Sequence, residues 1–138
     1  MKRFSILVIL AATLLCACSK ENVTRYEAGV SHDLAEWRKA TIEGLKYNID
    51  INLVENVGTV DIALSLAQSE EIVVDFRATE NILDVRLNGS EVEHRIFNEH
   101  IVIARSEVEA GKNIVNITFI VDNQSLNRND EFLYTLLV

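Results

Sequence analysis

The chain has 138 residues, 49% of them apolar and 25% charged, with five glycines and no proline. The length fits one domain, and the apolar content excludes an intrinsically disordered chain, because enough surface can be buried to offset the entropy of ordering. A formal net charge of −8 argues against nucleic-acid binding, in which Lys and Arg side chains must neutralise phosphates.

Residues 1–17 are predicted to be a signal peptide rather than part of the fold. Lys2 and Arg3 precede the apolar run 6–15, which is shorter than the ~20 residues that a membrane-spanning helix needs. An ordinary secretory signal is one interpretation of this segment, and a lipoprotein signal is the other.

The sequence Leu-Cys-Ala-Cys at 15–18 resembles a bacterial lipobox, which favours the lipoprotein interpretation. Cys18 is then the lipidated residue, and 18–23 is a polar tether whose charges resemble the export signal of Bacteroidetes-type lipoproteins. This predicts a protein anchored to the membrane of the cell envelope through its lipid, on its periplasmic or surface face. Both cysteines lie in this segment, so the domain itself is predicted to have no disulfide or zinc thiolate.

The domain, 24–138, begins with a predicted helix. Thr24 and Glu27 fit a capping box, and Gly44 suits the position just after a helix end. Trp37 is expected to pack this helix on the body rather than to stack on a ligand. The positions with helical spacing are Val30, Leu34, Trp37 and Thr41.

After Gly44 the apolar period changes from 3.6 to 2, which predicts strands. The run 45–53 alternates strictly, with Leu, Tyr and Ile on one face and Lys, Asn and Asp on the other, and forms a hairpin with 60–66. Asn88-Gly89 predicts another hairpin, because both residues tolerate positive φ. The fold class is therefore all-β: an antiparallel β-sandwich or curved sheet with one N-terminal α-helix. Further strands are expected at 72–76, 82–87, 92–97, 100–104, 113–122 (central, apolar on both faces) and 131–138.

The residues show no catalytic or metal motif. His94 and His100 flank a predicted turn, and with Glu99 they would make a two-His, one-carboxylate set if they faced each other. The alternative is that both are surface residues, and His32 is expected to be solvated. Three arginines are expected to pair with acids across strands: Arg77 with Asp75, Arg86 with Asp84 and Arg95 with Glu93.

Four stretches, in chain order, carry motifs that occur together in one known family. They are 26–53, with an "L-x-Y-x-I-x-I" strand after a helix; 82–93, with "I-x-x-V-x-L-N-G"; 108–119, with "A-G-x-N-x-x-x-I-x-F"; and 125–138, with "L-x-R-x-x-x-x-x-Y-T". This order resembles the N-terminal domain of the aminopeptidase N family of zinc metallopeptidases (gluzincins). The matching residues are Arg38, Ile42, Leu45, Tyr47, Ile49, Ile51, Ile82, Val85, Leu87, Asn88, Gly89, Ala110, Gly111, Asn113, Ile117 and Phe119.

The resemblance implies a non-catalytic β-domain that packs on the catalytic domain of the same parent protein. In the family, zinc is bound by the motif H-E-x-x-H-x18-E of that later domain, which is absent here, so this chain alone is expected to be inactive. Leu136 and Val138 replace the family's Gln and Glu, so no substrate contact carries over. The resemblance also implies truncation before the catalytic domain, with an apolar patch exposed near Val138. The alternative function is a self-standing envelope lipoprotein that binds a glycan or a protein.

Overall fold

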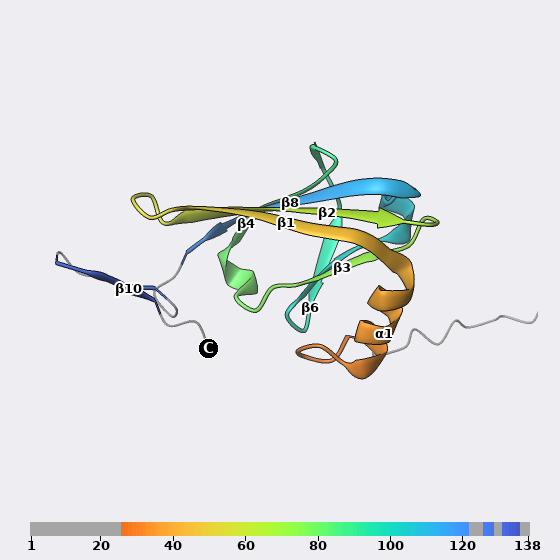
Figure 1. Cartoon of the computed structure of the whole chain (residues 1–138), viewed down its shortest axis with the longest axis horizontal. Coiled ribbons are helices and arrows are strands. Elements are labelled where there is room, and N and C mark those ends of the chain that lie inside the picture. Colours follow the sequence, from red (N-terminus) through yellow and green to blue (C-terminus); the bar gives the residue numbers. More distant parts are fainter. Residues whose placement is uncertain (1–25, 122–125, 129–130, 136–138) are drawn as a thin grey trace, which may run out of the picture.

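The computed structural model describes residues 26–121, 126–128 and 131–135. Over these ranges the protein is an all-β fold of antiparallel strands with one α-helix, as predicted (Figure 1). The predicted signal peptide, Cys18, the tether, Leu136 and Val138 lie outside the described residues. The elements are α1 (His32–Thr41), β1 (Ile42–Asn52), β2 (Val57–Leu66), β3 (Ile72–Asp75), β4 (Ile82–Leu87), β5 (Ser90–Glu91), β6 (His94–Phe97), β7 (His100–Ile103), β8 (Gly111–Ile120), β9 (Leu126–Arg128) and β10 (Leu133–Thr135), with short 3-10 turns at Thr79–Asn81 and Arg105–Glu107.

Two sheets make up the body of the domain. Sheet A has the order β1-β2-β8-β4-β5, sheet B has the order β3-β7-β6, and β9 and β10 form a separate two-stranded sheet in the described part of the chain. Every described pairing is antiparallel. The predicted central strand is confirmed, because β8 pairs with β2 on one side and β4 on the other.

The two sheets face each other across one apolar core. Sheet A contributes the inward residues of β2, β4 and β8, and sheet B contributes Ile72, Ile101 and Ile103. Val115 and Ile117 of β8 are almost completely buried at its centre. Burying a side chain of this size stabilises the fold by about 1.5–3 kcal/mol, so this layer holds the sheets together.

The helix is shorter than the sequence predicts. It begins after Ser31, whose hydroxyl oxygen accepts a hydrogen bond from the Leu34 amide at 3.1 Å, and it runs directly into β1 at Ile42. The predicted stop at Gly44 is wrong: that residue lies in β1 with φ of +62°, beside a break in register with β2. Strand pairing with β2 therefore begins before the position where helical propensity alone would end the helix.

Leu34 attaches the helix to sheet B. It is fully buried with Val73 and Val102, and Trp37 packs against this cluster. The predicted role of Trp37 as a packing residue is thus confirmed. Sheet B therefore covers the face of α1 that carries Leu34.

The strand predicted at 92–97 is shorter than expected, at His94–Phe97, and lies wholly in sheet B. Ser90 and Glu91 form β5 in sheet A, while His94–Phe97 form β6 in sheet B, with buried Val92 at the corner. The hairpin before β5 has the expected turn, since Asn88 and Gly89 have φ of +53° and +84°. A chain that changes sheets here can close the sandwich at this end.

Candidate functional site

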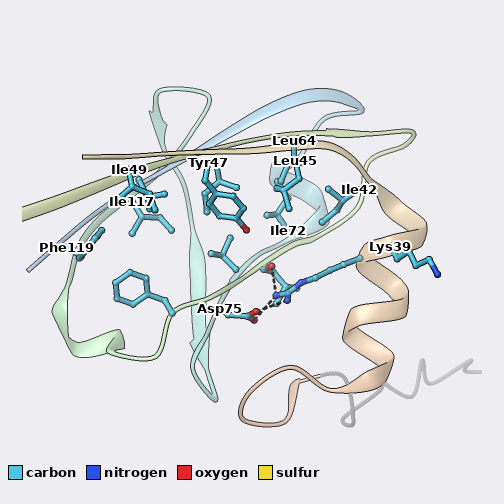
Figure 2. Close-up of a pocket in the computed structure, with 16 residues that line it drawn as sticks. Lys39, Ile42, Leu45, Tyr47, Ile49, Leu64, Ile72, Asp75, Ile117 and Phe119 are labelled. Carbon is cyan, nitrogen blue, oxygen red and sulfur yellow. Dashed lines mark hydrogen bonds and ion pairs between the residues drawn. The ribbon is translucent and has the colours of Figure 1, made fainter. Parts of the chain in front are cut away.

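An open groove lies between sheet A and β3, with α1 at one end (Figure 2). Its volume is about 480 Å³, and apolar side chains of β1, β2, β3 and β8 line most of it. Ile42, Leu45, Tyr47 and Ile49 line it from β1, and Phe76 and Phe119 lie against each other edge to face at 5.2 Å between ring centroids. This volume is within the range of small-molecule pockets, but the groove is open along β1.

The groove is open because sheet B does not cover β1. The apolar side chains of this strand alternate with polar ones as predicted, yet Leu45 is 50% exposed, Tyr47 55%, Ile49 60% and Ile51 48%. Their neighbours Val60, Ile62 and Leu64 in β2 are buried. Four large apolar side chains at alternate positions of β1 are therefore about half exposed, although the neighbouring apolar residues of β2 are buried.

A charge network borders the groove where α1 meets β3. The guanidinium of Arg38 donates two hydrogen bonds to the carboxylate of Asp75, at 2.7 Å and 2.6 Å, and a third to the Val73 carbonyl at 2.9 Å. His100 Nδ1 lies 2.7 Å from the same carboxylate. The side chains are 21%, 38% and 0% exposed for Arg38, Asp75 and His100. The three residues are called the charge network below.

Asp75 is ionised in this network. Burial by itself would raise the pKa of its carboxyl, but hydrogen bonds and positive charge from Arg38, together with His100, lower that pKa below its usual value. The His100 ring contacts two acceptors, because its Nε2 lies 3.0 Å from the Glu27 carbonyl oxygen. The two contacts together hold the ring in one orientation between the carboxylate and the backbone carbonyl.

The network also fastens the segment before α1 to sheet B. Besides the contact of His100 with Glu27, the Asn98 amide donates to the Tyr26 carbonyl at 2.8 Å. The Tyr26 hydroxyl donates to the Glu71 carboxylate at 2.6 Å. The hydrogen bonds of the charge network therefore hold α1 and the segment before it in place beside the groove.

The predicted histidine site does not form. His94 lies opposite Ile103, and His100 lies opposite Phe97, so the two histidines do not face each other across the β6–β7 turn. His94 and His32 are exposed as the surface interpretation expects, but for His100 that interpretation is wrong, because the ring is completely buried. Among the described residues, no group of three or more His, Cys, Asp or Glu side chains can hold a metal ion.

The predicted ion pairs have mixed outcomes. Asp84 and Arg86 do pair, at 2.7 Å, but they are two residues apart on β4 rather than on facing strands. Asp75 pairs with Arg38 and not with Arg77, because α1 lies over β3 and carries the guanidinium to it. The partners of Asp75 are 37 and 25 residues away in the chain, and no spacing rule in the sequence connects them.

Comparison with known proteins does not assign the chain to a family. No protein-family model matches it, and no curated protein matches it significantly. Among the described residues, no helix is both long enough and apolar enough to cross a membrane.

Proposed function

We propose that this chain is the non-catalytic N-terminal β-domain of a lipid-anchored zinc aminopeptidase, and that the open groove docks with the catalytic domain of the same parent protein. The observation that supports the proposal is the half-exposed apolar face of β1. Exposed apolar patches of this kind are typical of interaction surfaces, because water is released when a partner covers them. The identity of the proposed partner rests on the motif resemblance.

The proposed division of labour places the chemistry outside this chain. Zinc belongs to the catalytic domain, in which two His and one Glu would hold it, polarise the scissile carbonyl and activate water. This chain contributes the sandwich, the groove and, through Cys18, a lipid anchor to the cell envelope. It follows that the purified chain, supplied with zinc, releases no amino acid from aminoacyl amides, and measurable release would contradict the proposal.

The most direct test is the DNA sequence that follows the codon for Val138. The proposal expects a reading frame, in phase or shifted, that encodes A-R-x-x-F-P-C-x-D-x-P and then H-E-x-x-H-x18-E. A stop codon followed by an unrelated gene would contradict it. That result would favour the alternative, a self-standing envelope lipoprotein that binds a protein or a glycan.

A second test places a charge in the groove. Ile49→Lys removes an apolar contact from the β1 face, whereas Thr59→Lys adds the same charge at an exposed position on β2 and serves as the control. We expect Ile49→Lys to reduce the fluorescence of a bound hydrophobic dye and to weaken binding of the encoded catalytic domain about tenfold or more, since burying an Ile contributes about 1.5–3 kcal/mol. Equal behaviour of the two variants would show that the groove is not the docking surface.

A further inference from the structure

The outer edge of β1 is the longest edge in the two sheets. β1 has 11 residues, whereas the other edge of sheet A, β5, has two, and the edges of sheet B, β3 and β6, have four each. On β3, one backbone carbonyl already accepts a hydrogen bond from Arg38. Within the described residues, no strand pairs with the outer edge of β1 (Figure 1). Unpaired backbone groups over such a length can pair with another strand.

We propose that this edge pairs antiparallel with the same edge of a second copy of the chain, about a two-fold axis at Asn48. In this register Lys46 lies opposite the second copy's Asp50, and Asp50 lies opposite the second copy's Lys46. Both side chains are exposed on the polar face of β1. Opposite charges on directly facing residues stabilise strand pairs, so the edge is complementary to itself.

The charges select this register among the alternatives. Facing side chains of an antiparallel pair lie on the same face of the sheet. When the two strands are identical, the two-fold axis therefore passes through one residue, which faces its own copy, and each residue of the strand defines one possible register. An axis at Tyr47 or Ile49 leaves both charges opposite uncharged residues. An axis at Lys46 or Asp50 puts like charges opposite each other, which destabilises pairing. Only the axis at Asn48 satisfies both charges.

The same register joins the apolar faces of the two copies. Tyr47 lies opposite the second copy's Ile49, an aromatic and β-branched pair that favours strand association. Because facing side chains point to the same side of a sheet, the two open grooves become neighbours on one face. The ladder is regular from Lys46 to Asn52, since the bulge between Glu43 and Lys46 interrupts it at the other end.

Lysines and bulges on edge strands commonly prevent association with another strand. Without Asp50, Lys46 and the bulge beside it would have that effect here. Asp50, four residues further on, changes the outcome, because it supplies the opposite charge at the distance that a two-fold pairing requires. The inference does not depend on which domain covers the groove, because it uses the edge and the polar face of β1.

Charge reversal tests the pairing. Dimerisation is measured by sedimentation equilibrium up to about 1 mM chain, which covers the range of weak specific association. Asp50→Lys and Lys46→Asp each turn two attractive pairs into two repulsive ones, and we expect each to raise the dimer dissociation constant about tenfold or more. The double variant Lys46→Asp/Asp50→Lys restores the complementary charges and should return the constant to near that of the unmodified chain. Glu80→Lys, an exposed position away from β1 with the same change of net charge as Asp50→Lys, is the control and should leave the constant unchanged.

Crosslinking tests the axis itself. In a chain with Cys16→Ser and Cys18→Ser, Asn48→Cys places two thiols opposite each other, with Cα atoms about 4.5–5.5 Å apart, which is within disulfide range. We expect rapid oxidation to a covalent dimer, whereas Asn52→Cys, which lies opposite the second copy's Gly44, should stay monomeric. A chain that remains monomeric at about 1 mM, a double reversal that fails to restore the dimer, or equal crosslinking at positions 48 and 52 would each overturn the proposal.

Discussion

Replacing Asp75 by asparagine keeps the shape of the side chain and removes the negative charge at the centre of the charge network. Three contacts converge on this carboxylate, two from Arg38 at 2.7 Å and 2.6 Å and one from His100 at 2.7 Å. An amide has one acceptor oxygen, and its NH₂ group would face another donor. At least one of the three contacts is therefore lost in Asp75→Asn.

The size of the effect follows from the exposure of the carboxylate. A hydrogen bond to a charged group contributes about 1.5–3 kcal/mol, but Asp75 is 38% exposed, so water replaces part of the lost interaction. We expect the free energy of unfolding at pH 7 to fall by about 2 kcal/mol. For a domain of this size, that corresponds to a decrease of about 8 °C in Tm.

The effect should depend on pH in one direction. The folded-state pKa of Asp75 is lowered, so its stabilisation is fully present above the unfolded pKa of about 3.9 and is lost as the pH falls through the folded pKa. Asparagine does not titrate. The difference between the unmodified chain and Asp75→Asn should thus be complete at pH 7 and shrink below about pH 4.

Urea unfolding followed by the fluorescence of Trp37, the single tryptophan, measures this difference at each pH. Asp84→Asn is the matched control, because Asp84 and Arg86 form an ion pair whose side chains are 39% and 49% exposed. It should change the free energy of unfolding by less than about 1 kcal/mol. The reasoning is refuted if Asp75→Asn costs no more than Asp84→Asn, or if its effect is the same at pH 7 and at acid pH.

Three further substitutions test the packing by the same unfolding assay. Ile117→Ala, at the centre of the core, should cost about 2–4 kcal/mol, whereas Ile114→Ala, which is 44% exposed on the other face of β8, should cost much less; similar losses would contradict the assigned core. Gly58→Ala places a Cβ against the Phe119 ring, too close for van der Waals contact, and should cost about 1–3 kcal/mol. The added Phe119→Leu should relieve part of that loss, and additive effects would disprove the clash. Ser31→Ala removes the helix cap and should cost about 1 kcal/mol, so an unchanged stability would show that the cap contributes nothing.

The sequence predicts the fold class well because its signals are local. Strict alternation over 45–53 identifies β1 and its two faces, and Asn88-Gly89 identifies a turn by its positive φ values. Two boundaries differ from the prediction: the helix ends at Thr41 rather than before Gly44, and the strand expected from residue 92 begins at His94, in sheet B. Both are decided by which sheet the neighbouring residues join, and that choice depends on partners far away in the chain.

The candidate site could be predicted only in part. The apolar face of β1 is visible in the sequence, but its exposure is not, because alternation is the same for a covered and an uncovered strand. The charge network escaped prediction altogether. Arg38 has the signature of a cation near a helix end, and nothing in the sequence connects it with Asp75 or His100.

Composition and apolar periodicity are enough to predict an acidic, all-β domain with one helix, and the sequence carries no local motif of a catalytic or metal site. Only the packing of the sheets shows that sheet B covers β2 and β8 but leaves the apolar face of β1 open as one side of a groove. It also shows that, among the described residues, no strand pairs with the outer edge of β1. Tertiary structure also decided that His100 is buried between Asp75 and the Glu27 carbonyl. Both results have the same physical reason. Periodicity determines which side chains share a face of a strand, but the packing of the second sheet determines which of those faces are buried.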